Sequence, residues 1–247
     1  MDIIIEKSNK KFYRDGNSLI KVFDENSFSK ADVLNEALNN ARVEETGLKI
    51  PKLLDVRRTE DGWAITREYI EGKTLSQLMD ENPDKLDEYL EKFVDLQLEI
   101  HSKKCPLLNK IKDKMHAKIS SSDYEATLRY DLHNRLEGMK KHTKVLHGDY
   151  CPSNIIVTDN DEYYIVDWSH ATQGNASADA ARTYLVFTLQ GKPDLAEKYL
   201  NLFCKKADIA KQLVQQWMPI VACSQSVKHI EGEKEILDSW VNVFDFQ

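Results

Sequence analysis

Three oxygen-bearing side chains lie close together along the middle of the 247-residue chain. Asp149 and Asn154 belong to the stretch His147-Gly148-Asp149-Tyr150-Cys151-Pro152-Ser153-Asn154, and Asp167 ends the hydrophobic run Ile165-Val166-Asp167. A loop of the form HxDxxxxN, followed by a hydrophobic strand that ends in Asp, is typical of sites that hold Mg²⁺ and direct a hydroxyl at the terminal phosphate of a nucleotide. The residues therefore predict phosphoryl-transfer chemistry.

A β-hairpin is expected to bring two of these side chains together. The segments 155–158 and 163–166 are apolar enough for strands, and the polar segment 159–162 between them is typical of a hairpin connection. Asn154 then begins one strand and Asp167 ends its partner. Both side chains are thus predicted at the same end of the hairpin, beside the loop that carries Asp149.

Each of the three residues suits a different part of the chemistry. Mg²⁺ prefers oxygen ligands and usually takes one or two carboxylates together with substrate phosphates and water, so Asn154 and Asp167 are the predicted ligands. Asp149 is predicted to accept the proton of the attacking hydroxyl. The alternative is ordinary turn chemistry, because Asp and Asn are common turn residues. The spacing and the strand context together favour the functional interpretation.

Phosphoryl transfer also needs a cation at the phosphates of the nucleotide. Lys21 lies in the middle of a predicted strand, between Ile20 and Val22, and is the candidate for this contact. Glu36, on the helix that follows, is its predicted partner in a Lys–Glu ion pair. The alternative for both is a solvated surface charge. Residues 8–10 (Ser8, Asn9 and Lys10) are the predicted loop over the phosphates, although they include no glycine.

Residues 1–70 predict a small antiparallel β-sheet with one helix. Strands at 11–14 and 18–23 flank the turn Asp15-Gly16-Asn17, and two more are expected at 52–56 and 63–69. The helix is expected from Ser29, its N-cap, to about Glu45. Apolar residues recur at helical spacing on the face formed by Ala31, Leu34, Leu38 and Ala41.

Residues 71–247 predict a larger and mainly helical lobe. Its exception is a β island at 144–168, which carries the three oxygen-bearing side chains. Helices resume near Ser177, where Ser177 or Asp179 is the expected N-cap. The segments 105–142 and 195–247 are the expected substrate-binding helices. The fold class predicted from this order is α+β, with a nucleotide-binding lobe at 1–70 and a boundary near residue 71.

Composition excludes several classes of protein. The formal net charge is -7, which argues against a general nucleic-acid binder. The N-terminal apolar run covers only Ile3–Ile5, too short for a signal peptide or membrane anchor. Four scattered cysteines, without a CxxC pair, argue against a disulfide framework and against a structural zinc site. We therefore expect a cytoplasmic protein, a monomer or weak dimer, with no membrane or nucleic-acid partner.

These motifs resemble those of the aminoglycoside phosphotransferase/choline kinase family, the small-molecule branch of the protein-kinase-like fold. The resemblance rests on Leu146–Asn154, Ile165–Trp168 and Ala178–Arg182, with support from Tyr13–Phe23 and Arg67–Gly72. It implies a two-lobe kinase fold and transfer of phosphate from Mg-bound ATP or GTP to a small-molecule hydroxyl. Gly148, where protein kinases carry Arg, and Trp168 after the metal aspartate point to the small-molecule branch.

The resemblance also implies a role for each candidate residue. Asp149 is the catalytic aspartate, Asn154 and Asp167 are the Mg²⁺ ligands, and Lys21 with Glu36 is the nucleotide-phosphate pair. The segment from Glu68 to Ile70 resembles the hinge whose backbone meets the purine. Arg182 is expected to pair with an acid near the catalytic loop, and His147 and His101 are expected to be structural.

The acceptor remains open at this stage. An aminoglycoside, a choline-like amino alcohol and a sugar are all compatible with the motifs. Acids in the tail suit a cationic acceptor, and aromatic residues suit a quaternary ammonium cage. The acids are Glu231, Glu233, Glu235, Asp238 and Asp245, and the aromatics are Tyr150, Trp168, Trp217, Trp240, Phe244 and Phe246. Two other functions stay as alternatives, a protein kinase and a non-catalytic nucleotide-binding pseudokinase.

Overall fold

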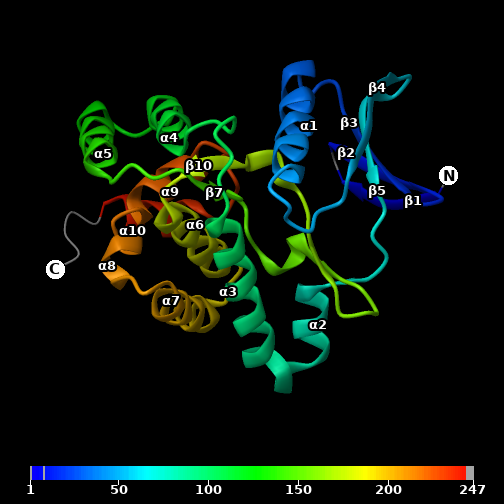
Figure 1. The fold of residues 1–247 in the computed structure, drawn as a ribbon. Coiled ribbons are helices and arrows are strands. Elements are labelled where there is room, and N and C mark those ends of the chain that lie inside the picture. Colours follow the sequence, from blue (N-terminus) through cyan, green and yellow to red (C-terminus); the bar gives the residue numbers. More distant parts are fainter. Residues whose placement is uncertain (1, 8, 243–247) are drawn as a thin grey trace. The chain divides into compact units, whose positions relative to one another are not determined.

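The computed structural model describes residues 2–7 and 9–242 (Figure 1). The chain forms two compact units, each made of two segments. The first unit contains Met1–Leu86 and Pro152–His170, and the second contains Asp87–Cys151 and Ala171–Gln247. Within the described part of the chain, no helix combines the length and the apolar character needed to cross a membrane.

A five-stranded antiparallel sheet is the main element of the first unit, in the order β1-β2-β3-β5-β4. Its strands are β1 (Asp2–Lys7), β2 (Lys10–Asp15), β3 (Ser18–Phe23), β4 (Leu53–Thr59) and β5 (Gly62–Glu68). The predicted hairpin is confirmed, because β2 pairs with β3 around a turn in which Gly16 has a φ of +56°. Strand β1 was not predicted, since the exposed Ile3, Ile4 and Ile5 show no alternation of polar and apolar residues.

Helix α1 (Lys30–Glu44) follows β3 and begins as predicted. The Ser29 hydroxyl accepts from the Asp32 N–H, and the Asp32 carboxylate accepts from the Ser29 N–H, which completes a capping box. The buried face, however, differs from the prediction. Val33 and Ala37 pack with Phe23 and Ile65 of the sheet. The predicted face is wrong, because Ala31, Leu34 and Leu38 are exposed and the neighbouring stripe contacts the sheet instead.

A smaller sheet, β6-β8-β9, completes the first unit with one helix. It is formed by β6 (Lys73–Thr74), β8 (Ile155–Val157) and β9 (Tyr163–Ile165), and the helix is α2 (Leu75–Glu81). The predicted hairpin is confirmed, since Ile155 pairs with Ile165 and the Asp161 N–H donates to the Thr158 carbonyl oxygen. Gly72 is required before β6, because a Cβ there would lie 2.2 Å from the Val157 carbonyl oxygen.

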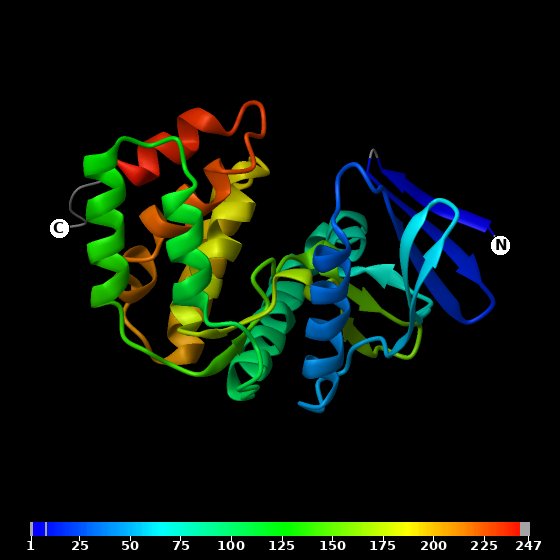
Figure 2. The same ribbon diagram turned by 90° about the horizontal axis from the view of Figure 1, so that it is seen from above.

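The second unit is mainly helical, as predicted. Its helices are α3 (Leu86–Ser102), α4 (Ile111–Ser120), α5 (Ala126–Gly138), α6 (Ala176–Leu189), α7 (Pro193–Ala207), α8 (Lys211–Gln215), α9 (Met218–Ser226) and α10 (Lys234–Val241). A two-stranded antiparallel sheet pairs β7 (Lys144–Leu146) with β10 (Thr172–Gly174). Seen from above, α4 lies beside α5, and α6 packs against α9 (Figure 2).

The N-cap of helix α6 lies two positions before Ser177 and four before Asp179, the two predicted caps. Asn175 is the N-cap, with its side chain accepting from the Ser177 N–H, so the assignment to Ser177 or Asp179 is wrong. Asp179 lies inside the first turn and is completely buried. Its carboxylate is therefore available for contacts with another segment of the same unit rather than for capping its own helix.

Candidate active site

A buried ionic group joins the sheet and the helix of the first unit. The Lys21 ammonium lies 2.7 and 3.0 Å from the two carboxylate oxygens of Glu36. Arg67 Nη2 also donates to Glu36 Oε1, at 2.7 Å. All three residues are at least nine-tenths buried. The structure thus brings Lys21 and Glu36 together and adds Arg67, to which the sequence assigned no charge role.

Strand register explains why Arg67 joins this group. Leu19 of β3 pairs with Arg67 of β5, and Lys21 pairs with Ile65. Residues two apart on a strand share a face, as do residues directly opposite, so Lys21 and Arg67 are diagonal neighbours on one face of the sheet. The arginine was detectable only once the pairing of these two strands was known.

Asp167 lies beside this ionic group, in a strained backbone conformation. Its φ of +62° is in the left-handed region, which a non-glycine residue adopts at a cost. Burial alone would raise the pKa of the Asp167 carboxyl. The charges of Lys21, Arg67 and Lys10, together with a hydrogen bond from Ser169, outweigh burial and hold that pKa well below its ordinary range. Asp167 is therefore a carboxylate at neutral pH.

Asn154 reaches the same end of the β8–β9 hairpin as Asp167. It ends the short 3₁₀ turn Pro152–Asn154, directly before β8. The Val166 N–H donates to the Asn154 carbonyl oxygen at 2.9 Å, so the backbones of Asn154 and of the residue preceding Asp167 are in contact. This arrangement agrees with the hairpin argument from the sequence.

The segment predicted to be a hinge, Glu68 to Ile70, lines a small cavity within the first unit. Glu68, Tyr69 and Ile70 form part of its wall, together with Leu19 and Asp167. The N–H groups of Glu68 and Tyr69 already donate to the carbonyl oxygens of Lys52 and Asn17. Of the predicted phosphate loop, the Asn9 carbonyl oxygen accepts from the Asp24 N–H, and Ser8 lies outside the described residues.

The loop that carries Asp149 belongs to the second unit and is held by Asp179. The Asp179 carboxylate accepts from the N–H of His147 at 3.2 Å and from the N–H of Gly148 at 2.7 Å. It also lies 3.0 Å from His101 Nε2. Burial would raise the pKa of Asp179, but its contacts with His101, His147 and Gly148 lower that pKa overall. Asp179 therefore anchors the loop as an anion.

His147 helps to shape this loop from inside. It is fully buried, and its Nδ1 atom accepts from the Asp149 N–H at 3.3 Å. Gly148 adopts a φ of +80°, a conformation that favours glycine at this position. The position and contacts of His147 are those of a structural residue.

Asp149 itself is paired with an arginine. Arg182 Nη2 donates to Asp149 Oδ1 at 3.1 Å, and Arg182 Nη1 donates to Gln225 Oε1 at 2.8 Å. The expected pairing of Arg182 with an acid near the loop is thus found. The Asp149 side chain keeps 31% of its surface exposed, so its carboxylate remains accessible. Gln225 was not predicted, because a lone glutamine on an apolar helix carries no sequence signal.

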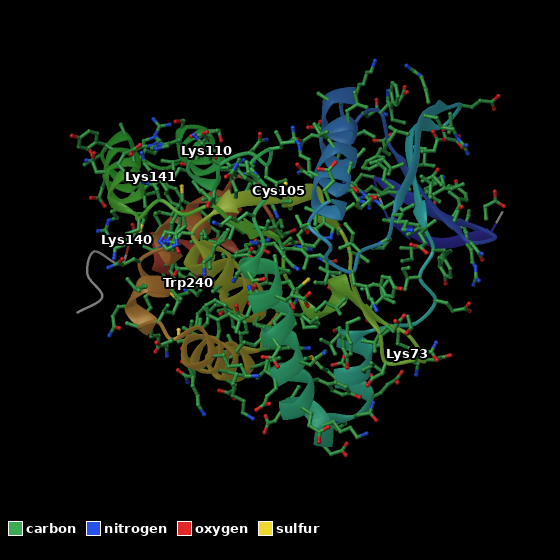
Figure 3. All side chains as sticks on the ribbon, in the orientation of Figure 1. Lys73, Cys105, Lys110, Lys140, Lys141 and Trp240 are labelled. Carbon is green, nitrogen blue, oxygen red and sulfur yellow. The ribbon has the colours of Figure 1, made fainter. Side chains whose placement is uncertain are left out.

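The aromatic residues considered for a cationic acceptor are mostly core residues. Tyr150 and Trp168 are fully buried, and each donates to a backbone oxygen, of Phe93 and Ile165 respectively. Trp217 is buried as well. Trp240 (labelled in Figure 3) packs against Tyr184 in a tilted arrangement, with ring centroids 5.4 Å apart. Asp245, Phe244 and Phe246 lie outside the described residues.

Solved structures share this fold at low sequence identity. A thermostable mutant of aminoglycoside phosphotransferase APH(4)-Ia, in a ternary complex with AMP-PNP and hygromycin B, is 15% identical, with a TM-score of 0.67 over 96% of this chain and 89% of that one. Choline kinase LicA from Streptococcus pneumoniae is 17% identical, with a TM-score of 0.64 over 95% and 87%. A choline/ethanolamine kinase family protein from Mesorhizobium loti is 13% identical, with a TM-score of 0.61 over 98% and 81%.

These likenesses define the class of protein, a mixed α+β protein with the kinase-like fold. A family model described as the phosphotransferase enzyme family matches residues 7–212. The chain belongs to that family, and the resemblance inferred from its motifs is confirmed. A comparison with curated proteins found no match.

Proposed function

We propose that this protein is a kinase that transfers the terminal phosphate of a Mg-bound nucleotide, ATP or GTP, to a hydroxyl of a small molecule. The observation that carries the proposal is the buried group of Lys21, Glu36 and Arg67 beside the ionised Asp167. Burying charges costs free energy, which pairing offsets only in part. A functional role explains why such a group is retained, and a phosphate-binding lysine held by a glutamate has that role in kinases.

Residues 1–70 are the proposed nucleotide-binding lobe. Lys21 contacts the phosphates of the nucleotide, and Glu36 and Arg67 hold its ammonium in place. The segment from Glu68 to Ile70 meets the base. Because the N–H groups of Glu68 and Tyr69 are already used within the unit, contacts with a base would come from the carbonyl oxygens of this segment or from Ile70.

The donor set at the end of the β8–β9 hairpin fits Mg²⁺. Among the described residues, the buried Asp167 Oδ1 atom has no hydrogen-bond partner, as expected for an oxygen reserved for a cation. Asp167 and Asn154 would hold the ion, which when bound neutralises charge on the phosphates. Asp167 is already ionised at neutral pH, so no proton has to leave before a cation binds.

Asp149 is the proposed catalytic residue. The acceptor's hydroxyl oxygen forms a bond to the terminal phosphorus, and the bond from that phosphorus to the bridging oxygen breaks. The nucleoside diphosphate leaves with the bonding electron pair, and the hydroxyl proton passes to the Asp149 carboxylate. Arg182 orients this carboxylate by holding one oxygen, and Asp179 fixes the loop backbone on which Asp149 stands.

An acceptor screen tests the proposal directly. Consumption of ATP and of GTP, corrected for phosphate release to water, would be measured over aminoglycosides, choline, ethanolamine, methylthioribose, homoserine and sugars. We expect at least one acceptor to stimulate consumption in wild-type protein and not in Asp149→Asn. Stimulation by none of them would support the non-catalytic alternative instead.

A further inference from the structure

A cavity of about 280 Å³ lies in the second unit, at the N-terminal end of α4, and we call it the α4 cavity. Its wall is formed by residues 110–113, 140–143 and 173–175, together with His116, Glu137 and Trp217. The wall includes neither Asp149 nor its partners Arg182 and Gln225. Small-molecule sites span roughly 300–1,000 Å³, so a cavity near the lower end of that range has room for a small metabolite.

Lysines are the commonest charged residues of this wall. They are Lys110, Lys112, Lys140 and Lys141. Lys110, Lys140 and Lys141 (labelled in Figure 3) are exposed, and none of them forms an ion pair with another described residue. Lys112 is engaged, because its ammonium group donates to the Glu137 carbonyl oxygen at 2.9 Å. Three exposed lysines thus bring positive charge to one small cavity, in a protein whose formal net charge is -7.

Two carboxylates, Glu137 and Asp113, also belong to the wall. Glu137 is occupied by other groups, since its Oε1 atom lies 2.7 Å from His116 Nε2 and its Oε2 atom lies 3.9 Å from the Lys112 ammonium. Asp113 is exposed in the first turn of α4, where a carboxylate is favourable to the helix dipole. The three exposed lysines are therefore opposed mainly by one carboxylate, that of Asp113.

The first turn of α4 meets this cavity without a side-chain cap. Lys110 is the N-cap residue of the helix, and its side chain makes no capping hydrogen bond, because an ammonium group has no acceptor atom. N–H groups at the start of a helix lack partners within the helix and carry a partial positive charge. A helix end of this kind, beside a lysine-lined cavity, suits a bound anion.

A buried donor in the wall is the second, independent sign of a ligand. Trp217 is 1% exposed, and its indole Nε1 atom has no hydrogen-bond partner in the part of the chain that the structure describes. The indole of Trp168, by contrast, donates to the Ile165 carbonyl oxygen at 3.0 Å. An unpaired buried N–H costs free energy, and its place in the wall of a cavity is explained by an acceptor that occupies the cavity.

We propose that the α4 cavity is a binding site for a small organic anion, either a phosphate ester or a carboxylate. Its oxygens accept from the Trp217 indole N–H and from the first turn of α4, and the three exposed lysines neutralise its charge. The site goes beyond the proposed kinase activity, because its residues have no part in the transfer of phosphate to the acceptor. Binding of the anion can therefore be measured without turnover.

The indole N–H of Trp217 reports on the site directly. The chain contains four tryptophans, so the Trp217 resonance in an isotope-labelled full chain is the one that Trp217→Phe removes. The probes are glycerol 3-phosphate, glycerate and glycerol, which share a three-carbon skeleton and differ in charge. We expect one or both anions to shift the Trp217 resonance, and glycerol or an equal ionic strength of chloride to leave it in place. The tighter-binding anion identifies the preferred chemistry.

Charge variants of the wall test the electrostatic part, with affinities measured by calorimetry. Lys140→Gln combined with Lys141→Gln should weaken binding of the anion by roughly 10-fold, and Asp113→Asn should strengthen it by roughly twofold. The matched control is Lys198→Gln combined with Lys205→Gln on α7, which removes two exposed charges of the same unit away from the cavity. Equal weakening in the control would show general attraction of anions and overturn the site.

Trp217→Phe tests the donor, because it keeps an aromatic ring and removes the N–H. Affinity for the anion should fall roughly 3- to 10-fold, while the melting temperature of the free protein changes little, since no hydrogen bond is lost. Trp168→Phe, which does lose a hydrogen bond, should lower the melting temperature and leave the affinity unchanged. The lysine variants are exposed, so they decide the matter if Trp217→Phe does not fold.

Two outcomes would overturn the inference. A Trp217 resonance that responds to neither anion, or as strongly to glycerol, would assign the indole N–H to water. Loss of anion binding in Asp149→Asn would place the anion at the proposed acceptor site instead, and would leave the kinase activity standing. Wild-type affinity for the anion in Asp149→Asn is the expected result, because Asp149 is not part of the cavity wall.

Discussion

Two ionic groups, one in each unit, are built in opposite ways. Around Glu36 in the first unit, Lys21 and Arg67 share one carboxylate, and the three side chains are 4%, 9% and 5% exposed for Lys21, Arg67 and Glu36. Around Asp149 in the second unit, Arg182 contacts one oxygen, and the pair is 31% and 15% exposed. The first arrangement fixes a cation in position, and the second leaves a carboxylate accessible.

The difference indicates that the two ionic groups have separate roles, one toward the nucleotide and one toward the acceptor. A buried cation in fixed geometry suits a nucleotide, whose phosphates are the same in every turnover. An accessible carboxylate suits an acceptor, whose hydroxyl has to reach it in each turnover. The variants below change one ionic group at a time, so that the role of each group is tested independently of the other.

The largest effect is expected from Asp149→Asn. Removing the proton acceptor should reduce kcat by roughly 10²- to 10⁴-fold, the usual contribution of a general base, while the melting temperature changes little. The measurement is steady-state kinetics with the best acceptor of the screen. Asp131→Asn is the matched control, since Asp131 forms an ion pair with Arg135 on α5. A turnover within threefold of wild type would remove Asp149 from the mechanism.

Glu36→Gln should cause the largest loss of stability. It leaves Lys21 and Arg67 buried without their shared carboxylate, which costs roughly 3–5 kcal/mol. Lys21→Met should cost less, because Glu36 keeps its contact with Arg67. Urea unfolding measures both free energies. The exposed pair of Lys73 and Glu81 is the control, since Glu81→Gln should cost less than about 1 kcal/mol. Equal losses in Glu36→Gln and Lys21→Met would contradict the shared-carboxylate account.

Sequence patterns predicted a structural feature correctly where that feature depends on residues close together along the chain. The β8–β9 hairpin and the Ser29 cap were predicted, because spacing and local turn chemistry determine them. The Lys21–Glu36 pair was predicted for another reason, the Lys–Glu ion pair that kinase chemistry requires. The buried face of α1 was wrong, since the sheet can contact either of two apolar stripes and only tertiary packing decides. Arg67 and Gln225 escaped notice because their partners are distant in sequence.

A smaller effect is expected in the pH dependence of stability. The pKa of Lys114 is lowered from 10.5 to about 8 in the folded protein, so the unfolded state binds more protons between these values. Stability from this group therefore rises as pH increases through that window. The free energy of unfolding of wild type relative to Lys114→Gln should increase from pH 7.5 to pH 10, and Lys110→Gln should show no such trend. If the free energies of unfolding of wild type and Lys114→Gln changed in parallel with pH, the lowered pKa of Lys114 would be contradicted.

Nucleotide binding with and without Mg²⁺, measured by calorimetry on three proteins, tests the central claim most directly. Wild type and Asp149→Asn should bind ATP with similar affinity and gain equally from Mg²⁺, because Asp149 serves the acceptor. Asp167→Asn should lose most of the gain from Mg²⁺, because the buried oxygen that fits the cation has been replaced. Metal-independent affinity in wild type, or equal loss of binding in both variants, would contradict the assignment of nucleotide and metal to one ionic group and of the acceptor to the other.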